Sequence, residues 1–504
     1  MKVVFLLFDS LNKRALQCYG GSNIRTPNFS RFGERAVRFN NHYVGSMPCM
    51  PARRDMHTGR LNFLHRSWGP LEPYDRSAIA ILRDRGVHSH LVSDHLHYFY
   101  EGGGTYHTQY SSWEFIRGQE ADRWKAMVQP PLERFREMYH DNQYDLQDDR
   151  YLPYMMNREF IREESDFPLV KCIAAGLDFL DRNHDRDDWI LQIECFDPHE
   201  PFYAPPRFRQ EYPSGYQGPI LDWPRYDRLS EDAHEIEELR ANYAALTTMC
   251  DEYLGKVLDF FDERDLWSDT VLIATTDHGF LLGEHDWWAK NKMPFYNEIA
   301  NIPLLVYHPA YADRGGEARG ALTQTMDVMP TLLDLFETAI PDTAEGLSLI
   351  PAVAESADRH EGLLYGMFGG AVNVTDGRYT YFRYPENIFE QDIYEYTLMP
   401  MHQRSFFGHN ELAGLELAEP FGFTDGLKLM KMPARKAADG RVDVHGLHED
   451  TTTVLYDLET DPGQLSPIDA PEIIGRLEGL MLELMRRNEA PPEAFSRIGL
   501  DPHL

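Results

Sequence analysis

VVFLLFD (residues 3–9) is a short apolar run near the start of the chain that ends at an aspartate. WILQIE (189–194) and VLIATTDH (271–278) repeat this arrangement, with an acid or a histidine directly after the apolar residues. Apolar runs of this length, without regular polar alternation, are typical of strands buried on both faces of a parallel sheet. The three stretches predict an α/β fold with a large central, mostly parallel sheet flanked by helices.

A fourth, weaker run at residues 87–92 is interrupted by polar side chains and is followed by an acid and two histidines. Between these runs, residues 76–85, which Gly86 ends, and residues 235–261 predict helices. In an open α/β sheet, ligands bind beyond the carboxyl ends of the strands. We therefore expect the polar residues at the four strand ends to form one site.

The pattern changes in the last third of the chain. Residues 372–382 form two alternating runs around Asp-Gly, which predicts a hairpin, residues 453–457 predict a strand, and residues 471–487 predict a helix. We predict two domains, an α/β domain at 1–360 and a smaller α+β domain with a short antiparallel sheet at 361–504.

The charge balance excludes several classes of partner. The 504 residues include 49 Lys+Arg against 81 Asp+Glu, a net charge of −32, and 42% are hydrophobic, which is the composition of a folded globular protein. Long-range repulsion opposes binding to nucleic acid or to an acidic membrane, so neither is expected as a partner. An anionic small substrate requires a pocket whose local charge is reversed.

Cysteine usage and hydropathy indicate a reducing, cytoplasmic location. No Cys-x-x-Cys pair, no signal peptide and no apolar segment of the roughly 20 residues needed to cross a bilayer is recognisable. The five cysteines are few and scattered, unlike a disulfide framework: Cys18, Cys49, Cys172, Cys195 and Cys250.

Acids and a histidine at two predicted strand ends have the chemistry of metal ligands. Asp277 and His278 offer one oxygen and one nitrogen after the same strand, and Asp9 offers a second oxygen after the first strand. The alternative is that each is an ordinary helix cap or turn residue. Their shared placement at strand ends favours a divalent metal site.

Cys49 precedes Pro51 and Arg53. An arginine nearby lowers the pKa of a thiol, so Cys49 is a candidate nucleophile. The alternative is a small buried cysteine at the start of a helix that begins with proline.

Several basic residues are further candidates. His199 lies between Pro198 and Pro201, which restrict the loop and would hold the imidazole for acid–base chemistry; capping a helix is its alternative role. Lys290 follows two tryptophans, where it could bind an anion or form a cation–π contact with an indole.

His95 and His97 are two residues apart, so in an extended segment they share one face and could hold an anion. Each could equally be a surface residue. The glycine run at 102–104 is only a weak signal for phosphate binding, because no strand–loop–helix pattern with Lys-Ser/Thr surrounds it.

Taken in order, these motifs resemble the sulfatase family of the alkaline-phosphatase-like superfamily. The resemblance runs from the first strand to about residue 465. The matching elements are Cys49-x-Pro51-x-Arg53 with Thr58-Gly59, His199-x-Pro201-Phe202, Asp277-His278-Gly279 with Gly283, His285 and Lys290, and the Tyr456-Asp457-Leu458 and Asp461-Pro462 segment.

The resemblance implies a mechanism. Cys49 would be converted to formylglycine by a formylglycine-generating enzyme. His199 would protonate the leaving alcohol, or position it together with Lys290. Two sets of residues would do the rest: Asp9, Cys49, Asp277 and His278 would hold a divalent metal, and Arg53, Lys290 and His95 or His97 would neutralise the sulfuryl oxygens.

The sequence also departs from the family pattern. Ala52 stands where the family usually has serine, Ser10 where a second aspartate is common, and His278 where asparagine is common. One early Asp with a later Asp-His pair is similar to the phosphonate monoester hydrolase branch. Calcium is the metal most common in the family, whereas a histidine ligand favours manganese.

Three hypotheses follow. The first is a hydrolase of small anionic sulfate monoesters; the second is a phosphonate monoester or phosphodiester hydrolase that uses the same formylglycine; the third is an inactive binding protein of the same fold. Homo-oligomerisation through the C-terminal helix or residues 399–434 remains open.

Overall fold

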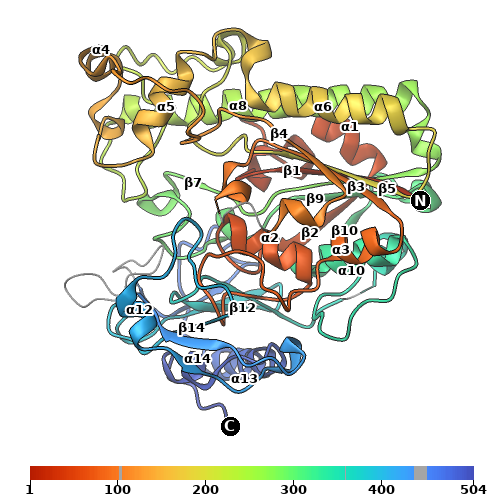
Figure 1. Ribbon diagram of the computed structural model, residues 1–504, viewed down its shortest axis with the longest axis vertical. Coiled ribbons are helices and arrows are strands. Elements are labelled where there is room, and N and C mark those ends of the chain that lie inside the picture. Colours follow the sequence, from red (N-terminus) through yellow and green to blue (C-terminus); the bar gives the residue numbers. More distant parts are fainter. Residues whose placement is uncertain (101–104, 358, 436–450, 504) are drawn as a thin grey trace.

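The computed structural model describes residues 1–504 except 101–104, 358, 436–450 and 504, so the glycine run at 102–104 lies outside the described residues. An eight-stranded sheet forms the centre of the molecule (Figure 1). From edge to edge its strands are β10 (Ala318–Gln324), β2 (Val37–Tyr43), β9 (Leu304–Tyr307), β6 (Thr270–Thr275), β1 (Lys2–Phe8), β5 (Trp189–Cys195), β3 (His88–Ser93) and β4 (Ser112–Phe115).

The sheet is parallel except at β9, which runs antiparallel to both of its neighbours. The four runs that the sequence predicted as strands are β1, β5, β6 and β3, and they form consecutive neighbours in the order β6-β1-β5-β3. In the register, Leu7 of β1 lies opposite both Glu194 of β5 and Thr275 of β6. The carboxyl ends of these three strands are therefore level with one another.

Strand β1 is buried on both sides, as its unbroken apolar sequence predicts. Val4, Leu6 and Phe8 pack into the core that also contains residues of α6 (Pro168–Asn183) and α8 (Ala233–Glu263). The alternate residues of β1 pack into the opposite core with α3 (Ala78–Asp84) and α10 (Val328–Leu335). Figure 1 shows α6 and α8 on one side of the sheet and α2 (Cys49–Thr58), α3 and α10 on the other.

The residue before each of the two predicted helices explains where the helix begins. Helix α8 starts at Ala233 because the Asp232 side chain accepts hydrogen bonds from the backbone N–H groups of His234 and Glu235. Helix α3 starts at Ala78 rather than at residue 76, because Ser77 has extended backbone angles.

A smaller part of the molecule begins with β11 (Leu363–Gly366) and lies at the bottom of Figure 1. The predicted hairpin is present as β12 (Val372–Thr375) and β13 (Tyr379–Arg383), which belong to an antiparallel sheet with the order β11-β12-β13-β17. Helix α13 (Pro471–Arg487) packs on this sheet, and a three-stranded sheet has the order β14-β16-β15. These strands are β11 (Leu363–Gly366), β14 (Tyr394–Thr397), β15 (Glu416–Leu417), β16 (Met430–Pro433) and β17 (Val454–Asp457).

The α/β class with a smaller antiparallel part is thus confirmed, whereas the boundary at residue 360 stays a prediction. The remaining elements are short: α1 (Pro27–Arg35), α4 (Leu132–Met138), α5 (Tyr151–Arg158), α7 (Pro206–Arg209), α9 (Asn297–Ala300), α11 (Ile350–Ala354), α12 (His409–Ala413), α14 (Pro492–Ser496), β7 (Leu281–Leu282) and β8 (Trp288–Ala289).

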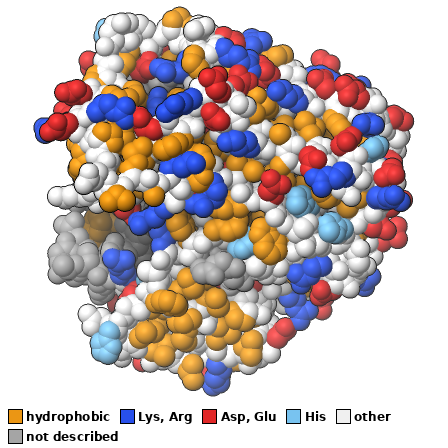
Figure 2. Space-filling model, turned by 45° about the horizontal axis from the view of Figure 1, so that its top comes forward, with side chains coloured by type: hydrophobic (Ala, Val, Ile, Leu, Met, Phe, Trp, Pro, Cys, Tyr) orange, Lys and Arg blue, Asp and Glu red, His pale blue; other side chains and the backbone are white. Residues whose placement is uncertain are grey.

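The surface differs between the two parts. Figure 2 shows hydrophobic side chains gathered in the lower part of the molecule, whereas charges of both signs are scattered over the rest of that face. Among the described residues, none of the helices combines the length and the apolar character that a membrane span requires. Between residues 406 and 427 the exposed large hydrophobic side chains are Phe406, Leu412, Leu415, Leu417 and Leu427.

Candidate active site

The carboxyl ends of β1, β5 and β6 bring three buried carboxylates to one place, around the guanidinium of Arg53. Arg53 lies on α2 and donates to Glu194 Oε1 (2.6 Å), Asp277 Oδ2 (2.7 Å) and Asp9 Oδ2 (2.8 Å). All four side chains are at most 1% exposed. Buried charges are tolerated when they are paired in this way.

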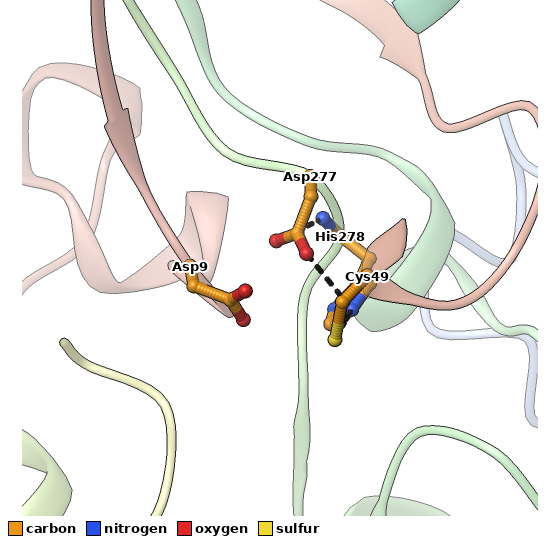
Figure 3. A group of neighbouring side chains, drawn as sticks. All are labelled: Asp9, Cys49, Asp277 and His278. Carbon is orange, nitrogen blue, oxygen red and sulfur yellow. Dashed lines mark hydrogen bonds and ion pairs between the residues drawn. The ribbon is translucent and has the colours of Figure 1, made fainter. Parts of the chain in front are cut away.

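Asp9, Cys49, Asp277 and His278 face a common space in Figure 3. One potential ligand atom from each lies within 4.8 Å of the others, and all four residues are buried. His278 Nδ1 lies 3.0 Å from the Gly279 carbonyl, which can only accept, so Nδ1 carries the hydrogen and Nε2 keeps its lone pair. Two carboxylates and an imidazole nitrogen suit a divalent cation.

Cys49 is the first residue of α2, and its Sγ lies 3.3 Å from His278 Nε2. Arg53 does lower the pKa of this thiol, as expected, but its effect is outweighed. Burial and the neighbouring Asp9 and Asp277 carboxylates raise the pKa of Cys49 well above its ordinary value, and Lys290 and Arg53 only partly offset them. The unmodified cysteine is therefore a protonated thiol.

Arg53 does not lie where it could contact sulfuryl oxygens, because carboxylates occupy its hydrogen-bond donors. Its Nε and both Nη groups bind carboxylates, and Nη1 also donates to the Cys49 carbonyl at 2.9 Å. The geometry makes Arg53 the counter-charge that holds Asp9 and Asp277 in place.

Lys290 is the cation that lies on the cavity side of this cluster. Its Nζ donates to Ser10 Oγ at 2.8 Å and lies 3.9 Å from Asp9 Oδ1. The predicted contact with an indole is not the one formed, because Nζ lies 5.6 Å from the ring centroid of Phe280. Ser10, which replaces an expected acid, thus positions the lysine, a role that the sequence did not reveal.

His199 lies in a tight loop after β5 and is only 3% exposed. Its Nδ1 lies 2.6 Å from the Glu200 carbonyl oxygen and so donates to it, which leaves Nε2 as an acceptor. Burial and the nearby Lys290 lower the pKa of His199 to about 3. The imidazole is therefore neutral, which favours proton acceptance or positioning over protonation of the leaving alcohol.

His95 and His97 do not lie in one extended segment, although their rings pack edge to face with centroids 4.9 Å apart. Strand β3 ends at Ser93, whose Oγ accepts from the His95 backbone N–H, and a 3-10 helix follows at Leu96–Phe99. His95 Nε2 lies 3.2 Å from Asp9 Oδ2, beneath the cavity, whereas His97 lines the cavity. Of the two, only His97 is placed to meet a substrate.

A cavity of about 820 Å³ opens above this cluster. Its wall includes side chains between residues 118 and 166 and side chains from the smaller C-terminal part. Among the lining residues are Cys49, Ser67, Trp68, His97, Glu120, Asp148, Arg150, His199, Tyr226, Lys290, His402 and Arg404.

Comparison with known proteins gives consistent matches. The family model described as Sulfatase matches residues 2–338, and the model described as N-sulphoglucosamine sulphohydrolase, C-terminal, matches residues 283–416. A multifunctional alkaline phosphatase superfamily protein, PehA, of Trinickia caryophylli is 25% identical over 66% of this chain and 72% of its own. An arylsulfatase of Clostridium perfringens is 23% identical over 72% of this chain and 80% of its own.

Two of the solved structures with a similar fold illustrate the match. One is a protein in complex with its substrate D-glucosamine-2-N,6-O-disulfate, with a TM-score of 0.64 and 14% identity over 98% of this chain and 99% of that one. The other is the phosphonate monoester hydrolase of Agrobacterium radiobacter, with a TM-score of 0.64 and 16% identity over 97% and 96%. Because the sulfatase model spans more than half of the chain, this protein belongs to the sulfatase family and is a sulfuric ester hydrolase.

Proposed function

We propose that the protein hydrolyses small sulfate monoesters with a formylglycine derived from Cys49 and one divalent metal ion held by Asp9, Cys49, Asp277 and His278. The observation that carries the proposal is the clustering of these four ligand groups within 4.8 Å, next to a cavity of about 820 Å³ that Lys290 and His199 also line.

Two groups would supply chemistry that the twenty side chains lack. Formylglycine at position 49, once hydrated, would supply a geminal diol as the nucleophilic group. Asp9, Asp277 and His278, together with the side chain at position 49, would hold a divalent ion, which would supply Lewis acidity and positive charge.

Residues of the chain would orient the metal ligands and would bind the substrate and its protons. Arg53 holds the Asp9 and Asp277 carboxylates apart from one another and fixes their orientation. Lys290 stays cationic because, although burial opposes its charge, the surrounding Glu200 and Asp9 raise its pKa. Its ammonium would bind an ester oxygen and donate a proton to the leaving alcohol, while neutral His199 accepts or positions a proton through Nε2.

The charge that lines the cavity is balanced and not reversed, although a reversal was expected for an anionic substrate; this balance would still favour entry of an anionic ester into a protein with a net charge of −32. Six cationic side chains line the cavity against six acids, a local balance that the whole surface lacks: Arg150, Arg225, Lys290, Lys292, Arg404 and Arg435 against Glu120, Asp145, Asp148, Asp149, Asp227 and Glu395. A small monoester therefore suits the site better than nucleic acid or an acidic membrane.

The donor set also informs the choice of metal. Two carboxylates satisfy calcium, but calcium prefers an all-oxygen shell, and His278 Nε2 belongs to the cluster. The imidazole makes manganese a suitable alternative ion. The modifying partner would be a formylglycine-generating enzyme that acts on Cys49.

The test is a parallel assay of aryl sulfate and aryl phosphonate monoester hydrolysis, on protein whose Cys49 peptide has been analysed by mass spectrometry. We expect an aldehyde mass at Cys49 and turnover of the sulfate. A fully modified, metal-loaded protein that hydrolyses neither ester would refute the proposal.

His278 and Ser10 favour a second candidate, phosphonate monoester or phosphodiester hydrolysis. Both positions depart from the pattern common in sulfatases, and the phosphonate monoester hydrolase fold matches over 97% of the chain. A large preference for the phosphonate in the same assay would make this the principal activity.

A further inference from the structure

A second cavity lies outside the candidate active site. Its volume is about 1250 Å³, against about 820 Å³ for the catalytic cavity, and no described residue lines both. Residues 12–15 after β1, Asn40 and Asn41 of β2, and Leu458 and Glu459 after β17 contribute to its wall. A cavity of this size can hold an organic molecule rather than a single ion.

The segment that follows β1 holds Lys13 in this wall. The Asn12 backbone N–H donates to Tyr243 Oη at 2.9 Å. The Asn12 side chain forms two hydrogen bonds with the backbone of Phe280, through Nδ2 (2.8 Å) and Oδ1 (2.7 Å). These bonds fix the backbone directly before Lys13, so the fold itself places the lysine at the cavity.

The Lys13 ammonium has one hydrogen to spare. Its Nζ donates to the Asn40 carbonyl oxygen at 2.5 Å and to Asn301 Oδ1 at 2.6 Å. An ammonium carries three N–H groups, so these two neutral acceptors leave one N–H for a ligand. The bond to Asn40 lies in an exposed position, and a ligand in the cavity can therefore reach Nζ.

The charge of Lys13 has no counter-ion. In the part of the chain that the structure describes, no carboxylate forms an ion pair with Nζ. The adjacent Arg14 adds a second positive charge, and its own partner is Glu298. Burial and Arg14 lower the pKa of Lys13 to about 8, so the surroundings that the protein provides disfavour the ammonium. An anion beside Nζ would supply the missing counter-charge.

The other titratable groups of the wall do not replace this counter-ion. Tyr19, whose ring centroid lies 5.5 Å from Nζ, stays neutral because burial raises its pKa. Three acids of the wall already pair with arginines: Glu298 with Arg14, Glu459 with Arg378 and Glu211 with Arg25. Outside these pairs, Lys13 and Arg240 line the cavity with Glu237 and Glu284, an even balance in a protein with a net charge of −32.

Amide side chains form much of the remaining polar lining. Five asparagines with at least partial exposure line the cavity: Asn23, Asn40, Asn41, Asn297 and Asn301. An amide offers both donors and acceptors, which suits hydroxyl groups, and Tyr19 and Tyr212 add aromatic surface. An ammonium without a counter-ion among several amides favours a ligand that is both acidic and rich in hydroxyl groups.

We infer that this cavity binds an acidic sugar, whose carboxylate or sulfate group pairs with Lys13 and whose hydroxyl groups bond to the asparagine amides. This binding site is independent of the proposed function, because the two cavities share no described lining residue.

Calorimetric titration of the full-length protein with trigalacturonic acid at low ionic strength tests the inference, with maltotriose as the neutral control. We expect trigalacturonate to bind at least about tenfold more tightly than maltotriose. Lys13→Met should lose at least about tenfold in affinity for it, the effect of removing a hydrogen bond to a charged group. Lys292→Met, which removes a lysine from the catalytic cavity, should bind it as the wild type does.

Several results of this titration would overturn the inference. They are no binding to the wild type, equal affinities for the two sugars, or a loss in Lys292→Met as large as that in Lys13→Met. Inorganic sulfate is a further probe. If it binds as tightly as trigalacturonate and loses its affinity in Lys13→Met, the site takes a free anion and not a sugar.

The pH dependence of binding tests the role of the lysine itself. Because only the ammonium pairs with an anion and its pKa is about 8, wild-type affinity should fall about tenfold between about pH 7 and about pH 9, where the sugar carboxylates stay ionised. Lys13→Arg keeps its positive charge at both pH values and should bind without this dependence. A wild-type affinity that does not change with pH, or a folded Lys13→Arg protein that binds as weakly as Lys13→Met, would reject the inference.

Discussion

Two buried arginines support the active site from different sides. Arg53 lies beneath the cavity and binds the carboxylates of Asp9, Glu194 and Asp277. Arg66 lies beside it and is equally buried; it pairs with Glu72 and lies 3.8 Å from Glu395 Oε2. We call the first group the floor cluster and the second the wall cluster.

The clusters differ in what they connect. The floor cluster joins the ends of neighbouring parallel strands to the start of α2, all within the large sheet. The wall cluster joins residues 66–72 to β14 and the segment after it, through bonds from Arg66 to Thr397 Oγ1 and the Met401 carbonyl. Ser67, Trp68 and Glu395, which lie in or next to it, line the cavity. The floor therefore sets the chemistry, and the wall sets the shape of the space above it.

The largest effect should come from Cys49, which adjoins the floor cluster through the hydrogen bond from Arg53 to its carbonyl. Cys49→Ala removes the side chain that becomes formylglycine, so turnover should fall by at least about 10⁴-fold, as when other enzymes lose their nucleophile. The melting temperature should change little, since a small buried side chain replaces another. Steady-state kinetics and thermal denaturation test this, and activity retained by Cys49→Ala would exclude Cys49 as the nucleophile.

Arg53→Met should damage both stability and chemistry. It leaves three buried carboxylates without their shared counter-charge, and breaking a buried pair in this way costs about 3–5 kcal/mol. Urea unfolding of the metal-free protein measures the loss, and turnover should be abolished as well. An Arg53→Met protein as stable as the wild type would mean that the carboxylates are not charged in the folded state.

Arg66→Met tests the comparison between the two clusters, because it should lower the stability of the protein without abolishing turnover. A similar loss of about 3–5 kcal/mol is expected, since Glu72 is also fully buried. Because the floor stays intact, kcat on a small aryl sulfate should fall much less than in Arg53→Met at a temperature where both are folded. Equal losses of kcat would show that the floor and the wall form one unit.

The sequence predicted that residues of the floor cluster lie together, but it gave no sign of the wall cluster. Strand-end residues such as Asp9 and Asp277 follow apolar runs, and parallel pairing brings such ends together wherever the strands are neighbours. Glu194 shows the same signal, although its pairing with Arg53 was not expected. Arg66 and Glu395 are joined by tertiary packing between distant segments, which leaves no periodic pattern in the sequence.

Glu120 illustrates the same limit inside the site. It lies in a segment whose charge density is typical of a solvated surface, and the left-handed turn that carries it has no glycine at that position. The sequence indicated both His95 and His97, but it did not show that His95 contacts Asp9 whereas His97 lines the cavity, because this depends on where β3 ends.

The effect of metal removal on stability and turnover should depend on the floor cluster and not on the wall cluster. An ion that binds the folded state stabilises it by about 2.7 kcal/mol at a hundredfold excess over its Kd, so chelation should lower the melting temperature of the wild type and abolish turnover. Asp277→Asn should lose this response, whereas Arg66→Met should keep it. A metal-dependent shift of the same size in Asp277→Asn would place the ion elsewhere.

The smallest effect concerns His65, the neighbour of Arg66 in the wall. Its Nε2 donates to the Glu489 carbonyl at 2.9 Å, and burial lowers its pKa to about 3, so the folded protein keeps it neutral while the unfolded chain protonates it near its ordinary value. The stability that depends on this neutral ring is complete above about pH 6.5 and is lost as the pH falls toward 3. Between about pH 7 and about pH 5.5 the loss should be about 1 kcal/mol. Other buried histidines with a lowered pKa, such as His199, add to the loss in the wild type. Urea unfolding at the two pH values should therefore show the same loss in the wild type and in the exposed control His234→Gln, and a loss smaller by about 1 kcal/mol in His65→Gln. Equal losses in all three would mean that His65 is protonated in the fold.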